Sequence, residues 1–215
     1  MTTRIAVMAK APVAGLAKTR LAPALGTAGA AALAARLLRH AVGQAVAAAL
    51  GPVTLWAAPD VEHPAFQHLH TSLGVTLVAQ PGGDLGARMA RAFEDAFAAG
   101  PEPVLLMGTD APALDTTLLR AAAAALREHA VVLVPALDGG YALVGLREAG
   151  ARLLVALFDD MRWGTPSVLA DTRTRLAALG LRAAELPPVA DIDEPADLAH
   201  LRRLSPDWLA HLGTA

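Results

Sequence analysis

Short runs rich in β-branched and other apolar residues alternate along the chain with longer stretches rich in alanine and leucine. This alternation predicts an α/β protein with a mostly parallel central sheet and helices on both faces, because a helix returns the chain between two parallel strands. The expected strands cover residues 4–9, 53–58, 75–79, 104–107, 131–135, 141–146 and 182–186. The expected helices cover residues 27–50, 84–99, 115–128, 165–179 and 194–204, with Thr27, Asp115 and Thr165 as N-caps.

The sixth expected strand departs from the parallel pattern. Only five residues, 136–140, separate it from the fifth strand, and they are too few for a helical crossover. We therefore expect residues 141–146 to run antiparallel or to lie in a different layer. The length of 215 residues suits one domain, and we expect residues 1–215 to form it.

Composition narrows the classes of function. With 54% apolar and 18% charged residues the chain can bury a full core, and a net charge of −2 argues against a nucleic-acid-binding surface. The absence of cysteine excludes disulfides and thiolate catalysis, and it fits a reducing cytoplasm. Residues 41–59 carry no ionisable side chain, but Gly51 and Pro52 divide them, so we expect no membrane span. We interpret His63, His68 and His70 as a solvated helix face.

A cationic loop follows the first strand. Residues 8–23, MAKAPVAGLAKTRLAP, contain Lys10, Lys18 and Arg20 and no acid, so the loop is either a solvated surface or a cradle for an anion. It is no Walker loop, since the required glycines would fall at Pro12 and Ala17, and no Gly-x-Gly-x-x-Gly follows the strand. Any phosphate held here would be held by side chains, and we expect the loop to be exposed.

Acidic residues follow three of the other expected strands. Asp110 follows the fourth, Asp138 the fifth, and Asp191 and Asp193 the last. Each has a structural alternative, in a turn, a hairpin or a helix cap. Because ligands of open α/β sheets sit beyond the carboxyl ends of the strands, cations and acids together suggest a phosphate-and-metal site. Mg²⁺ needs only one or two carboxylates, so Asp110 with Asp191 or Asp193 would suffice.

Several motifs together resemble one family. AKAPVAGLAKTRLAPALG, QPGGDLGARM, MGTDAPAL, DGGYALVGL, RWGTPSVLADT and DIDEPADL are similar to the bacterial glycosyltransferase-like family often associated with arsenosugar biosynthesis. That family lies within the GT-A nucleotide-diphospho-sugar transferase superfamily, and phospholactate and molybdenum-cofactor guanylyltransferases are more distant relatives. The resemblance implies a Rossmann-like GT-A sheet, a nucleotide beside the first loop, and Mg²⁺ or Mn²⁺ on Asp110 with Asp191 and Asp193. It implies nucleotide or substrate contacts from Ala9, Lys10, Lys18, Arg20, Gln80, Asp84, Asp138, Gly139, Gly140, Tyr141 and Trp163.

Two catalytic functions are expected from these features. The first is a metal-dependent glycosyltransferase with a nucleotide-diphospho-sugar donor and a small-molecule acceptor, in which Lys18, Arg20 and the metal on Asp110 neutralise the departing diphosphate. The alternative is a nucleotidyltransferase that attacks the α-phosphate of an NTP and releases pyrophosphate. A nucleotide-binding protein without catalysis is a third class. The sequence leaves the base, the sugar, the acceptor and the oligomeric state open, a homo-oligomer included.

Overall fold

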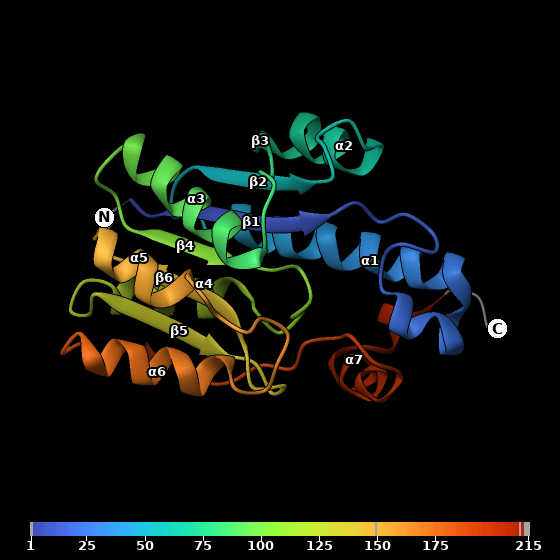
Figure 1. Ribbon diagram of the computed structural model, residues 1–215. Coiled ribbons are helices and arrows are strands. Elements are labelled where there is room, and N and C mark those ends of the chain that lie inside the picture. The colour runs from blue at the N-terminus through green and yellow to red at the C-terminus, as the bar shows by residue number, and fades with distance from the viewer. Residues whose placement is uncertain (1, 149, 211, 213–215) are drawn as a thin grey trace.

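Seven strands form one sheet in the computed structural model, which describes residues 2–148, 150–210 and 212 (Figure 1). The order across the sheet is β3-β2-β1-β4-β6-β5-β7. The strands are β1 (Arg4–Lys10), β2 (Val53–Ala58), β3 (Thr76–Ala79), β4 (Val104–Met107), β5 (Val131–Pro135), β6 (Tyr141–Leu146) and β7 (Ala184–Glu185). All seven expected strands are present, although the last is a two-residue edge strand rather than five residues.

The antiparallel exception falls where the short connection predicted it. β6 pairs antiparallel with both β4 and β5, while the other pairings are parallel. Because β6 runs in the opposite direction, its first residue, Tyr141, lies at the edge where β1 and β4 end. The carboxyl ends of the parallel strands and the β5–β6 turn therefore meet at one edge of the sheet.

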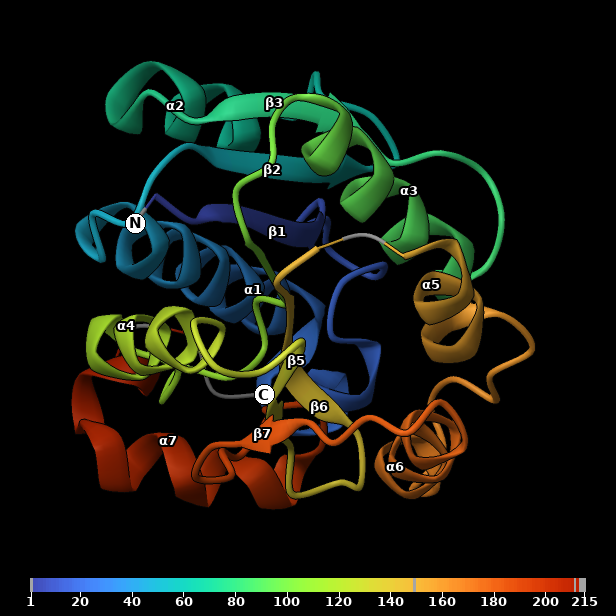
Figure 2. The same cartoon turned by 90° about the vertical axis from the view of Figure 1, so that its left-hand side faces the viewer.

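Helices cover both faces of the sheet, as expected (Figure 2). On one face α1 (Ala22–Ala47), α2 (Pro64–Leu73) and α4 (Thr116–Ala125) pack on alternate residues of the strands, such as Ile5 and Val7. On the other face α3 (Leu85–Ala98), α5 (Ala151–Phe158) and α6 (Val168–Ala178) enclose Ala6 and its neighbours. A smaller cluster joins the start of α1 to α7 (Leu198–Leu204) and to the short helices η1 (Thr19–Leu21) and η3 (Pro206–Leu209).

Helix ends were predicted less well than strands. Asp115 caps α4 as expected, since its carboxylate accepts a hydrogen bond from the Leu118 amide at 2.9 Å. The longer part of α1 begins at Thr27, as expected, after a break at Gly26, whose φ of 69° favours glycine, but a short helical turn from Ala22 precedes that break. Thr165 is no cap, because its hydroxyl donates to the Arg162 carbonyl and α6 begins only at Val168. The segment 194–204 opens with the short helix η2 (Pro195–Asp197) rather than with α-helix.

Two helices were absent from the expected set. α2 lies in the segment that carries the three histidines and confirms their interpretation as part of a helix, with His63 accepting a hydrogen bond from the Ala65 amide. α5 was not expected at all. The span Thr19–Ala47 is long and apolar enough to cross a membrane, but half of its most apolar window is buried in the protein. Packing of α1 against the sheet accounts for that apolar composition.

Candidate active site at the carboxyl edge of the sheet

An open cavity of about 1140 Å³ lies along the edge where β1 and β4 end. It is bordered by the cationic loop, the residues after β4, the β5–β6 turn and the segment after β7. The structure brings twelve of the predicted site residues to its lining: Ala9, Lys10, Lys18, Arg20, Gln80, Asp110, Asp138, Gly140, Tyr141, Trp163, Asp191 and Asp193. Asp84 and Gly139 are not among the lining residues.

Lys18 connects the cationic loop to two of the acids. Its Nζ lies 2.7 Å from Asp110 Oδ1 and 2.7 Å from Asp193 Oδ1. The Lys18 side chain is only 8% exposed, whereas the two carboxylates are 47% and 46% exposed. The expectation of an exposed loop is therefore wrong for Lys18. Its partners lie 92 and 175 residues further along the chain, where no local pattern reveals them.

Charge and main-chain contacts hold this cluster together. Burial alone would lower the pKa of Lys18, but the Asp110 and Asp193 carboxylates outweigh burial and hold that pKa above its ordinary value. The Ile192 amide donates to the Asp110 carbonyl at 2.9 Å, which joins the segment after β7 to the segment after β4. Asp197 accepts hydrogen bonds from the amides of Asp193 and Glu194, at 3.0 and 2.7 Å, and so orients the segment that carries Asp193.

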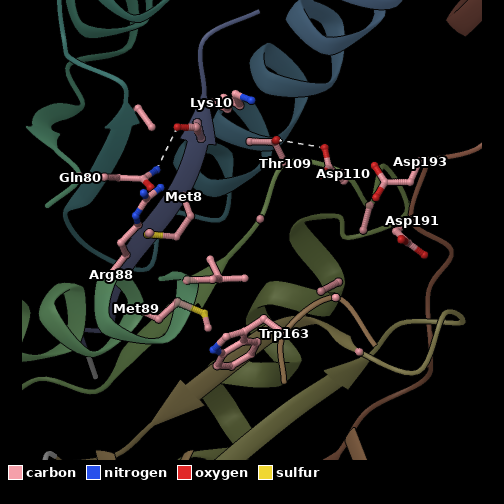
Figure 3. A pocket seen from close by; sticks show the side chains of 18 of the residues that line it. Met8, Lys10, Gln80, Arg88, Met89, Thr109, Asp110, Trp163, Asp191 and Asp193 are labelled. Atoms are coloured by element: carbon pink, nitrogen blue, oxygen red, sulfur yellow. Dashed lines mark hydrogen bonds between the residues drawn. The ribbon is translucent and has the colours of Figure 1, made fainter. Parts of the chain in front are cut away.

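Asp191 lies on the same side of the cavity as Asp110 and Asp193 (Figure 3). It makes no ion pair within the described part of the chain. Burial, and after it the negative charge of Asp138, raises the pKa of Asp191 to about 6. Of the two late acids, Asp193 is thus the one that shares a cation with Asp110.

The remaining cations of the loop are more accessible. Arg20 is 69% exposed and stands 3.7 Å from Glu194, a distance at which an exposed ion pair contributes little. The Lys10 ammonium donates to the Leu16 carbonyl at 3.1 Å. Both side chains line the cavity and can reach an anion placed in it.

A polar wall lies opposite the acids (Figure 3). The Gln80 amide nitrogen donates to the carbonyls of Ala9 and Trp56, at 3.0 and 2.8 Å, and this fixes the orientation of the amide across β1 and β2. Asp84 caps α3 by accepting from the Ala87 amide at 2.8 Å. Its carboxylate is therefore engaged at the start of α3.

The first turns of α3 add side chains that were not named individually among the expected contacts. Leu85, Arg88 and Met89 line the cavity, and Arg88 Nε donates to the Gly83 carbonyl at 3.0 Å. Their spacing of i, i+3 and i+4 places them on one face of the helix. The same spacing in GDLGARM is the signal that could have identified Arg88.

Aromatic side chains form the third wall. Tyr141 and Trp163 meet edge to face with ring centroids 6.3 Å apart, and Trp163 also stacks on Phe158. Burial raises the pKa of the Tyr141 phenol, and the nearby Thr172 hydroxyl only partly opposes this, so the phenol stays neutral. At the neighbouring turn, the Asp138 carboxylate accepts from the Gly140 amide at 2.8 Å, and Gly139 adopts a φ of 94° against Pro166.

The acid pair has the chemistry of a divalent-cation site. Asp110 Oδ1 and Asp193 Oδ1 lie no further apart than 5.4 Å, twice their common 2.7 Å distance to Lys18 Nζ. Opposite ligands of Mg²⁺ are about 4.2 Å apart, so a small movement would let both carboxylates bind one ion. Among the described residues no group of three or more His, Cys, Asp or Glu side chains could hold a metal. Phosphate and water would have to complete the shell.

Solved structures share this fold. Over 96% of this chain and 89% of the other, the chain is 29% identical to a protein of Desulfovibrio desulfuricans G20 described as a "putative nucleotide-diphospho-sugar transferase", with a TM-score of 0.84. It also matches CMP:2-keto-3-deoxy-manno-octonic acid synthetase complexed with CTP, at 12% identity over 96% and 99% of the two chains and a TM-score of 0.59.

A third match is 4-diphosphocytidyl-2C-methyl-D-erythritol synthase of Anaerococcus prevotii DSM 20548, with 12% identity, 94% and 97% coverage and a TM-score of 0.61. The fold is therefore that of nucleotide-diphospho-sugar transferases, and the synthetase and the synthase share it. No curated protein sequence matches the chain. A family model described as "Uncharacterized protein conserved in bacteria (DUF2064)" matches residues 37–165, more than half of the chain. The chain belongs to this DUF2064 family and has the nucleotide-diphospho-sugar transferase fold.

Proposed function

We propose that the protein is a metal-dependent glycosyltransferase that uses a nucleotide-diphospho-sugar donor and a small-molecule acceptor. The observation that carries the proposal is the Lys18 cluster, in which one loop cation lies 2.7 Å from carboxylates of two separate segments inside the cavity. A diphosphate placed there meets cations from the loop and acids able to bind a metal. The Desulfovibrio match supports this choice of reaction.

The position of each residue in the cavity suggests its role. Lys18 and Arg20 would neutralise negative charge that develops on the diphosphate as the bond to the sugar breaks. Gln80 and Arg88 would bind the base or ribose on the opposite wall. Bound Mg²⁺ or Mn²⁺, held by Asp110 and Asp193, would supply Lewis-acid stabilisation of the leaving group.

The other end of the cavity suits the acceptor. Tyr141 and Trp163 form its wall, and Asp138 stands at its rim. A volume of about 1140 Å³ exceeds what one small ligand usually fills, so a donor and an acceptor can both be accommodated. A cytoplasmic location is part of the same proposal.

A nucleotidyltransferase is the second candidate. The fold matches include two cytidylyltransferases, one of them complexed with CTP, and the same loop and acids could stabilise attack on the α-phosphate of an NTP. The two reactions differ in what leaves, a nucleoside diphosphate in the first case and pyrophosphate in the second.

The released product distinguishes the glycosyltransferase from the nucleotidyltransferase. The protein is incubated with a panel of nucleotide-diphospho-sugars and NTPs, with Mg²⁺ or Mn²⁺ and candidate small acceptors, and the released phosphate species are separated. Release of a nucleoside diphosphate supports the proposal, pyrophosphate supports the second candidate, and neither product from any mixture would refute both. Asp110→Asn is the matched inactive control.

A further inference from the structure

Lys18 differs from the other described cations of the cavity. It is nearly buried and lies 2.7 Å from two carboxylates, whereas Lys10 and Arg88 bind main-chain carbonyls and Arg20 stands 3.7 Å from its acid. Asp110 and Asp193 remain about half exposed to the cavity. The Lys18 ammonium therefore binds the two carboxylates from the protein side, while both carboxylates remain accessible from the cavity.

The backbone at Lys18 indicates that this placement is specific. Its φ of 48° and ψ of 43° are left-handed, a conformation that residues other than glycine rarely adopt. The following residues form η1, and the Leu21 amide donates to the Lys18 carbonyl at 2.9 Å. Such strain is found at ligand sites when surrounding contacts hold it in place. Here the two carboxylates provide those contacts.

From this geometry we propose that the Lys18 ammonium and a divalent cation are alternative occupants of the position between Asp110 and Asp193. Each carboxylate already binds Nζ at hydrogen-bonding distance, so a divalent ion placed between them would meet the positive charge of Lys18 at short range. The metal therefore has to displace the ammonium. The proposal rests on the proposed function in one respect, namely that a nucleotide phosphate is the new partner of the displaced Lys18.

Exchange of the two cations links metal binding to nucleotide binding. Without phosphate, Lys18 has no other described carboxylate at comparable distance, and it competes with the metal. With phosphate bound, Lys18 gains a new anionic partner, and the acid pair is released for the metal. A nucleotide that raises the affinity for metal must be bound more tightly in the presence of metal by the same factor.

The experiment measures Mn²⁺ binding to the full chain without nucleotide, from the electron paramagnetic resonance signal of free Mn²⁺. Lys18→Met removes the ammonium and keeps a long flexible side chain. We expect at least tenfold tighter Mn²⁺ binding than in the unmodified protein, which corresponds to about 1.4 kcal/mol. Adding Asp110→Asn to Lys18→Met should remove this gain and so locate it at the acid pair. An equal or weaker Mn²⁺ affinity in Lys18→Met would overturn the proposal.

A matched variant and a second substitution complete the test. Arg20→Met removes a cation from the same loop but not from the acid pair, and we expect less than a twofold change. Tightening by Arg20→Met as large as that by Lys18→Met would mean a general field effect and would also overturn the proposal. Lys18→Gln replaces Lys18→Met if the latter does not fold, with the same tenfold expectation. Because Mn²⁺ binding needs no substrate, this result stands apart from the product assay of the proposed function.

Discussion

Replacing Asp191 by asparagine should stabilise the protein at neutral pH and lose this effect in acid. Burial and the charge of Asp138 raise the pKa of Asp191 from 3.8 to about 6, so the folded state holds a proton that the unfolded state has released. The contribution of Asp191 to the free energy of unfolding therefore falls as the pH rises from about 4 to 6. Above that range the full destabilisation by the buried charge is present. A salt-bridged carboxylate has the opposite effect, because its pKa is lowered in the folded state and its charge stabilises the protein at neutral pH.

The magnitude follows from the shift and the exposure of Asp191. A difference of about two pKa units corresponds to roughly 3 kcal/mol, at 1.36 kcal/mol per unit. Asp191 is only half-buried, and solvent screening reduces this to about 1 kcal/mol. For a chain of this size we expect Asp191→Asn to raise the melting temperature by about 2–4 °C at pH 7.5.

The assay is urea unfolding in EDTA at a series of pH values from 4 to 7.5. The gain in free energy of unfolding from Asp191→Asn should be largest at pH 7.5, about half as large near pH 5, and close to zero at pH 4. Asp159→Asn, at an exposed carboxylate with no ion pair or side-chain hydrogen bond to the described residues, is the control and should show no such trend. A pH-independent gain, or a loss at neutral pH, would refute the reasoning.

Three further substitutions test separate parts of the account. Arg20→Ala should weaken nucleotide binding severalfold, as measured by calorimetry. It should change the free energy of unfolding by less than about 0.5 kcal/mol, since the side chain is 69% exposed. An unchanged nucleotide affinity would mean that Arg20 is only a solvated surface residue. Asp115→Ala should cost about 1 kcal/mol through loss of the α4 cap, measured by urea unfolding, and leave nucleotide affinity unchanged. Gly86→Ala should destabilise the protein by about 1–3 kcal/mol and alter Trp163 fluorescence. The reason is that the new alanine Cβ would meet the Phe158 carbonyl and lie 2.7 Å from Trp163 Nε1. An unchanged fluorescence spectrum and melting temperature would contradict this packing.

Strands and the edge they define were accessible from sequence because both depend on short-range patterns. Apolar runs located all seven strands, and the five-residue connection before Tyr141 indicated the antiparallel β6. The rule that ligands gather beyond the carboxyl ends then brought most of the candidate residues to one cavity. The first turn of α1, from Ala22 to the break at Gly26, was missed because Pro23 and Gly26 are locally typical of a loop.

Pairing within the site was not accessible from sequence. Lys18 has no acid near it in the chain, and only the fold places Asp110 and Asp193 beside its ammonium. Asp191 and Asp193 are two residues apart, and the sequence does not distinguish them as ligands. In the structure, the Asp197 carboxylate holds the Asp193 amide, and only Asp193 reaches the Lys18 ammonium. Asp84 was expected to contact the nucleotide or substrate, whereas the structure shows its carboxylate capping α3.

Metal-dependent stabilisation by a nucleoside diphosphate tests the central claim most directly. Melting temperatures are measured with UDP, GDP, CDP, ADP and dTDP, each with Mg²⁺ or Mn²⁺ and each with EDTA. A ligand at about 100 times its Kd adds roughly 2.7 kcal/mol, which is a rise of about 5–10 °C for a chain of this size. We expect at least one nucleotide to give this rise with metal and little of it in EDTA, and Asp110→Ala to abolish the metal-dependent part. Equal stabilisation in EDTA, or a full metal effect in Asp110→Ala, would contradict the shared site of phosphate and metal.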